Sequence, residues 1–145
     1  MFFLTDLPTK EMIRRYCNQY QTASPDCIEQ ALSMMKRASQ LMRELDRFFA
    51  QHDISQLKFL VLVVIDREPG RKKLFAHEIV KKLDISKPVL SRAVNSLFDK
   101  GLILVEKNEK DRRASEISLT VEGKAYLNAV FPDYFQLIHD FMGEQ

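Results

Sequence analysis

A run of polar and basic side chains between residues 86 and 113 carries the chemistry that this sequence could perform. Hydroxyl, amide and guanidinium groups can hydrogen-bond base edges and phosphate oxygens, and lysines can neutralise phosphate charge. The first of these residues recur at helical spacing, and the last gather in one short charged segment. The candidate residues are Ser86, Lys87, Ser91, Arg92, Asn95, Lys107, Lys110, Asp111, Arg112 and Arg113.

The positive charge of the chain is concentrated around these residues. The 145-residue chain contains 22 Lys/Arg and 20 Asp/Glu, which gives a net charge of +2. Residues 71–113 hold 12 Lys/Arg against 6 Asp/Glu, a charge of +6, and the remaining 10 against 14 give −4. A solvated basic face is the ordinary explanation of such a window, so the fold must decide whether this face meets phosphates.

Two short helices joined by a tight turn are predicted to position the first candidates. His77–Leu83 is predicted to form one helix, and Asp84 and Ile85 form the turn. Ser86 can cap a second helix over residues 87–100, whose polar candidates lie opposite an apolar face. That face consists of Val89, Leu90, Ala93, Val94, Leu97 and Phe98.

A charged β-hairpin follows the second helix. Gly101 ends the helix, and the β-prone runs Leu102–Val105 and Ala114–Leu119 are separated by a polar tip at 108–113. Two helices and a hairpin in this order are the parts of a winged helix-turn-helix. The predicted fold class is therefore mainly α with a small β-hairpin wing (α+β), in which the second helix enters the major groove.

Further helices are predicted on both sides of this region. Apolar residues recur at three- and four-residue spacing after Pro25 and indicate a long helix, and Lys10–Tyr20 indicates a shorter one. Leu57–Ile65 is apolar throughout, and its Val and Ile content favours a strand, although the local pattern does not decide. Thr120 can cap a last helix, which Pro132 is expected to kink.

Two segments resemble the MarR family of transcription regulators. DRRASEISLTVEG is similar to the family signature D-x-R, Leu-Thr and Gly, and matches it at Asp111, Arg113, Leu119, Thr120 and Gly123. The preceding SRAVNSLFDKGLI resembles the family's recognition helix and its exit. It matches at Ser91, Arg92, Leu97, Lys100, Gly101 and Leu102.

The resemblance implies a sequence-specific DNA-binding transcription regulator. It would be a dimeric repressor on a pseudo-palindromic operator in double-stranded DNA. The resemblance also implies that Leu57–Ile65 is helical. Arg113 would reach the minor groove, braced by an ion pair with Asp111, and Arg112 would contact a phosphate.

The resemblance further implies one domain over residues 1–145. Residues 1–52 and 121–145 would supply the helices of a homodimer, and residues 55–120 would bind DNA. The chain departs from the family in a shorter final helical region, a longer N-terminal segment and Phe75, which stands where a small capping residue is usual.

Several side chains admit both a structural and a chemical interpretation. Cys17 could sense an oxidant, but an unpaired cysteine on an apolar helix face is more often a core residue, which is the favoured interpretation. Met34, Met35 and Met42 could line a pocket for a small-molecule effector, although such methionines usually fill a core. Release of DNA by a small ligand or an oxidant stays open.

Other classes of protein are disfavoured. The four glycines form no phosphate-binding loop and no catalytic constellation is visible, so no enzyme is predicted. Scattered histidines (His52, His77 and His139) are expected at the surface, with no metal or cofactor. The longest apolar run is too short for a bilayer, MFFLTDLPTKEM lacks a basic leader, and two cysteines give no disulfide framework, so a cytoplasmic protein is expected.

One rival hypothesis remains for the predicted fold. A winged helix can serve as a protein-interaction module, or as an antagonist of another regulator, without binding specific DNA. The presence of Arg92, Asp111 and Arg113 argues against that alternative.

Overall fold

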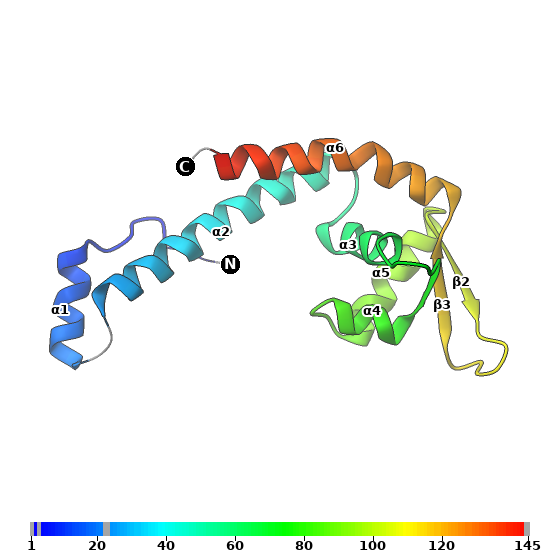
Figure 1. The fold of residues 1–145 in the computed structure, drawn as a ribbon, viewed down its shortest axis with the longest axis horizontal. Coiled ribbons are helices and arrows are strands. Elements are labelled where there is room, and N and C mark those ends of the chain that lie inside the picture. The colour runs from blue at the N-terminus through cyan, green and yellow to red at the C-terminus, as the bar shows by residue number, and fades with distance from the viewer. Residues whose placement is uncertain (1, 3, 22–23, 144–145) are drawn as a thin grey trace. The chain divides into compact units, whose positions relative to one another are not determined.

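The computed structural model describes residues 2, 4–21 and 24–143. It contains two compact units, Met1–Arg47 and Phe48–Gln145, and the boundary falls within the long helix α2 (Pro25–Gln51) (Figure 1). The candidate residues all lie in the second unit.

The first unit contains α1 (Lys10–Tyr20) and most of α2, and both helices are confirmed at the predicted positions. The hydroxyl of Thr9 caps α1 by accepting a hydrogen bond from the Met12 N–H (3.2 Å). Ile13 and Cys17 form the buried side of α1. Several large apolar side chains of this unit are exposed: Met12, Tyr16, Tyr20, Met34, Met35 and Met42.

The apolar segment after α2 is the helix α3 (Gln56–Asp66), so the strand that its β-branched residues favoured is wrong and the helix implied by the resemblance is confirmed. The hydroxyl of Ser55 caps it by accepting from the Lys58 N–H (3.3 Å). Among the described residues no single helix is long and apolar enough to cross a membrane; α2 and α3 pass that test only when they are counted together.

A loop at residues 52–55 joins α2 to α3, and it is fixed by two later elements of the second unit. The Lys100 ammonium donates to the Asp53 carbonyl (2.5 Å) and lies 3.6 Å from the Asp53 carboxylate. The Tyr126 hydroxyl donates to the His52 carbonyl (2.7 Å). Burial, and secondarily the charge of Asp53, raises the pKa of Tyr126 above its ordinary value, so the phenol keeps its proton.

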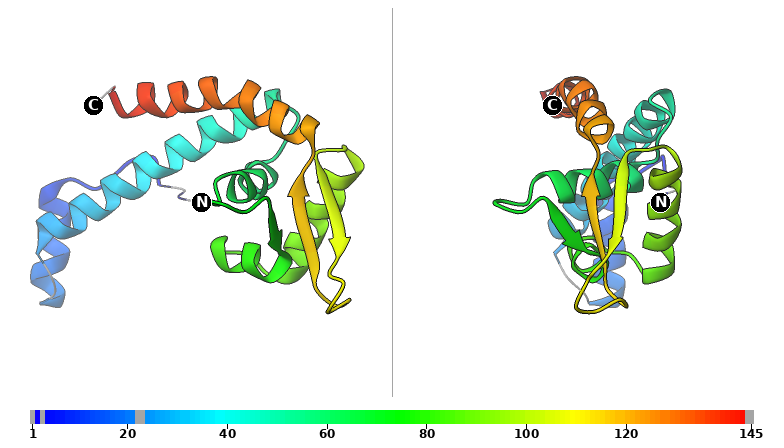
Figure 2. Two further views of the ribbon diagram at one scale, coloured as in Figure 1. Left: turned by 45° about the vertical axis from the view of Figure 1, so that its right-hand side comes forward. Right: turned by 90° about the vertical axis from the view of Figure 1, so that its right-hand side faces the viewer.

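A three-stranded antiparallel sheet follows, in the order β1-β3-β2. The predicted hairpin is confirmed as β2 (Ile103–Lys107) and β3 (Ser115–Leu119). The short strand β1 (Lys73–Phe75) was not predicted, and it pairs with β3 so that Leu74 lies opposite the buried Ile117. The tip of the hairpin projects at the end of the sheet that is far from the C-terminal helix (Figures 1 and 2).

The two short helices are confirmed as α4 (Ala76–Lys82) and α5 (Lys87–Asp99). Both pack against α3, and α5 also packs against β2. Gly101 follows α5 with φ +73°, and the N–H of Leu102 bonds the Leu97 carbonyl (3.0 Å), which is how helices commonly end at glycine.

The last helix, α6 (Val121–Gly143), begins at the predicted cap. The Thr120 hydroxyl accepts from the Gly123 N–H (2.9 Å) and donates to the Gly101 carbonyl (2.7 Å). Pro132 lies inside α6, and the expected kink there stays a prediction. Further along α6, Tyr134 joins a cluster with Phe49 and Phe59, and burial raises the pKa of its phenol.

Candidate nucleic-acid interface

Helix α5 and its cap carry half of the polar candidates, and those within the helix lie on one exposed face. The Ser86 hydroxyl caps the helix by accepting from the Val89 N–H (3.4 Å), and Pro88 occupies the first turn, where a missing N–H costs nothing. The opposite face is buried through Leu90, Ala93, Val94 and Leu97. Phe98 departs from the prediction, because its side chain is 52% exposed at the end of that face. The exposed polar residues are Lys87, Ser91, Arg92 and Asn95.

The start of helix α4 is bound by a charged side chain of the helix itself. Phe75 occupies the N-cap position and has no side-chain oxygen, so the Glu78 carboxylate alone accepts from the Phe75 N–H (3.0 Å). Arg71 donates two bonds to the same carboxylate, at 2.6 and 2.8 Å. The hydrogen bonds from Arg71, and then that from the Phe75 backbone, lower the pKa of Glu78 from 4.5 to about 2.

The tip of the hairpin is ordered by two of its own polar side chains. The Asn108 carbonyl oxygen accepts from the backbone N–H groups of Lys110 (2.9 Å) and Asp111 (3.0 Å), and its amide donates to Glu116 (2.7 Å). The Asp111 carboxylate accepts from the backbone N–H of Arg113 (3.0 Å).

The contact between Asp111 and Arg113 corrects one detail of the sequence-based expectation. In the described residues the Asp111 carboxylate makes no ion pair with the Arg113 guanidinium; it binds the Arg113 backbone instead. Asp111 therefore shapes the turn that carries Arg113 and leaves the guanidinium exposed.

A groove of about 500 Å³ lies between α5 and the wing. Its lining combines polar side chains with apolar ones that include Leu90, Val94, Val105 and Ile117. Five of the predicted site residues line it: Lys87, Ser91, Asn95, Asp111 and Arg113.

The other five candidates stand outside this groove but remain exposed. Ser86 and Arg92 belong to the start and the outer side of α5. Lys107, Lys110 and Arg112 lie on the wing, at the end of β2 and on the tip. The structure thus brings half of the predicted set around one concavity and places the remainder on the same two elements.

Ion pairing divides the basic residues of the 71–113 window into two groups. Four of the twelve, Arg71, Lys73, Lys82 and Lys100, make ion pairs with Glu78, Glu106, Glu68 and Asp53 respectively. For the other eight, which include all six basic candidates on α5 and the wing, the described residues provide no acidic partner within 4 Å. Six of these eight unpaired cations therefore lie on the face that the sequence assigned to DNA, and the other two are Lys72 and Lys81.

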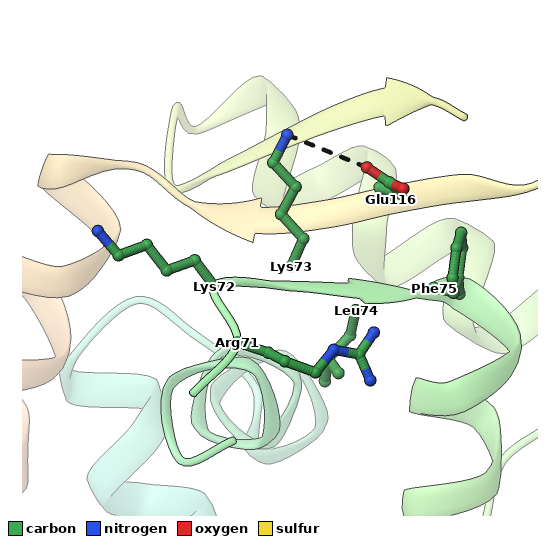
Figure 3. Close-up of a pocket in the computed structure, with 6 residues that line it drawn as sticks. All are labelled: Arg71, Lys72, Lys73, Leu74, Phe75 and Glu116. Carbon is green, nitrogen blue, oxygen red and sulfur yellow. Dashed lines mark ion pairs between the residues drawn. The ribbon is translucent and has the colours of Figure 1, made fainter. Parts of the chain in front are cut away.

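A second, smaller hollow of about 280 Å³ lies beside β1 and is less suited to an anion (Figure 3). Lys73 extends across the sheet toward Glu116 (4.0 Å) and bonds Glu106 (2.7 Å). These carboxylates raise the pKa of Lys73, Glu106 first by its hydrogen bond, and Arg71 is bound to Glu78. Arg71 and Lys73 are thus neutralised within the protein, whereas Lys72 has no acidic partner within 4 Å among the described residues.

Sequence reasoning did not single out His77, which lies at this groove. It was expected only to be a surface histidine, yet its exposed side chain lines the same groove as Ser91 and Arg113. The signal was available in its position near the start of α4, since the first helix of a helix-turn-helix crosses the DNA backbone.

The remaining chemical candidates lie elsewhere. Cys17 is buried and Cys27 is exposed, both in the first unit, and the burial of Cys17 agrees with its interpretation as a core residue. Within residues 2, 4–21 and 24–143 no group of three His, Cys, Asp or Glu side chains could hold a metal ion.

Comparison with known proteins gives consistent relatives. A model of the MarR family matches residues 52–114. The HTH-type transcriptional repressor YetL of Bacillus subtilis is 26% identical over 140 residues, covering 96% of this chain and 83% of YetL. The HTH-type transcriptional regulator PecS of Dickeya dadantii is 28% identical over 128 residues, covering 86% of this chain and 77% of PecS.

Solved structures show the same fold. A MarR family transcriptional regulator from Streptomyces coelicolor, solved in complex with DNA, superposes with a TM-score of 0.78 at 23% identity. The match covers 86% of this chain and 78% of that one. The winged-helix architecture, with its helix-turn-helix and hairpin, is thereby confirmed.

Proposed function

Since this chain belongs to the MarR family, we propose that it is a sequence-specific DNA-binding transcription regulator. Its curated relatives are named as regulators, and one of them as a repressor. Repression by a homodimer on a pseudo-palindromic operator is the proposed mode of action, in the cytoplasm and without catalysis. A small-molecule effector that releases the DNA is part of the proposal.

The groove between α5 and the wing is the observation that supports this function most directly. Ser91 and Asn95 stand on α5 where it faces that groove, and a helix of this size fits the major groove of B-DNA. Their hydroxyl and amide groups can bond base edges, so they would contribute to the choice of sequence. Arg92, on the outer side of α5, would bond a guanine edge or a phosphate.

The wing would contact the flanking minor groove. Arg113 is exposed on a turn that Asp111 orders, and an arginine suits the negative potential of a narrow minor groove. Lys107, Lys110 and Arg112 would bind phosphates and set the register of the protein on DNA. Phosphate contacts of this kind make affinity fall with salt.

Fluorescence anisotropy tests the proposal with DNA from upstream of the protein's own gene and with a scrambled duplex, at two salt concentrations. We expect the upstream duplex to bind about 10³-fold more tightly or better. Arg113→Ala should weaken binding without unfolding, whereas Arg15→Ala, the same change on the exposed surface of α1, should not.

Three outcomes have distinct meanings. Equal, weak binding of both duplexes would direct the search to other operators by selection from random DNA. If Arg113→Ala changes binding by less than about 0.5 kcal/mol, the minor-groove role is wrong. Absence of binding to selected or random duplexes at low salt would favour the protein-interaction module instead.

A further inference from the structure

The His77 side chain stacks on a neighbouring ring and interacts electrostatically with the Glu78 carboxylate. Its ring stacks on the ring of Phe75, with centroids 5.3 Å apart and an interplanar angle of 12°. Within the described part of the chain its two nitrogens have no hydrogen bond or ion pair. The stack fixes the plane of the imidazole, and its polar edge stays available to a ligand.

His77 stands between two concave surfaces. On one side it lines the groove of about 500 Å³ together with Ser91, Asn95 and Arg113. On the other side it lines a hollow of about 520 Å³ on the outer side of α4. The other residues of that hollow are Arg71, Phe75, Glu78, Lys81 and Lys82.

The charged groups that face His77 come from every element packed around it. From α5 and the wing these are Lys87, Asp111 and Arg113, and from the α4 side they are Arg71, Glu78, Lys81 and Lys82.

Several of these charges are already engaged. Arg71 and Glu78 bind each other, and Lys82 pairs with Glu68 (3.2 Å). Asp111 accepts from the wing backbone. The groups without an acidic partner among the described residues are Lys81, Lys87 and Arg113, so the surroundings of the imidazole favour an anion.

We infer that His77 is a further DNA-binding residue whose imidazole binds a backbone phosphate beside the bases that α5 reads, and that DNA binding takes up a proton at this ring. The inference rests on the proposed function and adds to it a regulation by pH. It agrees with the general geometry of helix-turn-helix proteins, in which the first helix crosses the DNA backbone.

The proton balance follows from the two forms of the ring. A neutral imidazole has one N–H donor, whereas the protonated ring has two donors and a positive charge. A phosphate brought next to the ring favours the charged form, so a proton moves from the solvent to the free ring nitrogen. Linkage then requires affinity for DNA to rise as pH falls, by at most about tenfold per pH unit for each protomer.

The experiment measures Kd for a selected operator duplex between pH 6 and pH 8 at constant ionic strength. The native protein should bind more tightly at pH 6, and His77→Gln should bind less tightly with a smaller dependence of log Kd on pH. His139→Gln, a matched change on the exposed surface of α6, should keep the native dependence. Circular dichroism at each pH checks that every variant is folded.

A lysine supplies the positive charge without a proton that exchanges in this range. His77→Lys should therefore bind at pH 8 about as tightly as the native protein binds at pH 6, and its affinity should not change with pH. Calorimetry in two buffers of different ionisation enthalpy should detect proton uptake on binding by the native protein and less uptake by His77→Gln.

Failure of the inference can be told apart from failure of the proposed function. If Arg113→Ala weakens operator binding but His77→Gln retains the native pH dependence, the role of His77 is wrong and the regulator stands. If the native protein binds no duplex at pH 6 or pH 8, both are wrong.

Discussion

Glu78 combines two roles at the scale of one residue. It accepts two hydrogen bonds from the Arg71 guanidinium and one from the backbone N–H of Phe75, the N-cap residue of α4. Serine or threonine is usual at the N-cap, and glutamate is usual at the position of Glu78. Because Phe75 cannot cap the helix with its own side chain, the start of α4 depends on this carboxylate. Glu78 thus supplies one half of a capping box, while the side chain of Phe75 supplies no hydrogen bond for the other half.

The stability of the protein should therefore depend on the ionisation of Glu78. Its pKa is lowered from 4.5 to about 2, so its stabilising effect is complete above pH 4.5 and is lost as pH falls from 4.5 to about 2. Glu78→Gln should lower the free energy of unfolding by about 1 kcal/mol at pH 7, and the difference from the native protein should shrink toward pH 2.

Urea unfolding at pH 7 and at pH 3 measures this difference. Glu44→Gln, on the exposed surface of α2, serves as the control and should change little at either pH. An equal loss at both pH values for Glu78→Gln would show that the charge of this carboxylate does not stabilise α4.

Gly123 is required for close packing between α6 and the backbone of Leu102. A Cβ atom at this position would overlap the backbone carbonyl of Leu102, which accepts a hydrogen bond from Thr120 N–H (3.1 Å). Glycine in this family-signature position therefore reflects space rather than backbone freedom, since its φ is helical.

Gly123→Ala should destabilise the protein by about 1–3 kcal/mol, although alanine is ordinarily the better helix former. Gly143→Ala, in the same helix with open space around the added methyl group, should be neutral or stabilising. Thermal unfolding of the two variants measures both effects. A stabilised Gly123→Ala variant would disprove the steric requirement.

At the scale of elements, local sequence predicted some features and could not predict others. The helices α1, α2, α4 and α5 carry caps or periodic apolar faces, which are signals within one turn or one helix. Helix α3 carries neither a polar face nor a helical preference, and its identity depends on burial by four other elements. Strand β1 has three residues and exists because β3 offers it an edge.

The candidate site likewise has a part that local sequence could predict and a part that it could not. The exposed side of α5 could be predicted from helical spacing, because the apolar face fixes where the polar residues point. The groove could not, since it arises where α5, α4 and the wing meet. For that reason His77 was missed, and the partner of Asp111 was assigned to a side chain instead of the backbone.

The aromatic cluster makes α3 the centre of the second unit. The Phe59 ring is fully buried, with centroids 4.9 Å from those of Phe49 and Tyr134. Phe59→Ala should lower the free energy of unfolding by about 3–5 kcal/mol. Phe135→Ala should cost much less, because that ring is 59% exposed on α6. Urea unfolding compares the two, and equal losses would show that Phe59 is not central to this core.

At the scale of the whole molecule, the net charge of +2 is the sum of unevenly distributed charges. Arg71 and Lys73 near β1, Lys82 at the end of α4 and Lys100 after α5 are neutralised by carboxylates, whereas the described residues provide no acidic partner for the cations on the face of α5 and the wing. A protein arranged in this way can bind a polyanion strongly on one surface while its total charge stays small.

Salt dependence should distinguish the two groups of cations. Lys87→Ala should reduce the slope of log K against log salt concentration by about 1 for each protomer bound, since each protomer loses one phosphate contact. Lys73→Ala, which removes a cation already bound to Glu106, should leave the slope unchanged. Titrations with operator DNA from 50 to 200 mM salt measure both slopes. If the two variants behave alike, internal pairing does not decide which cations meet DNA.

The self-contained hydrogen bonding of the wing tip has a consequence for protein engineering. Asn108 and Asp111 hold the turn, and their partners all lie within residues 108–116. The tip is therefore a cassette that can be transplanted onto another hairpin with its conformation intact. Within it, the side chains at positions 109, 110, 112 and 113 make none of these bonds, so a library randomised there should keep the turn. Under the proposed function it would vary the minor-groove contact separately from the scaffold.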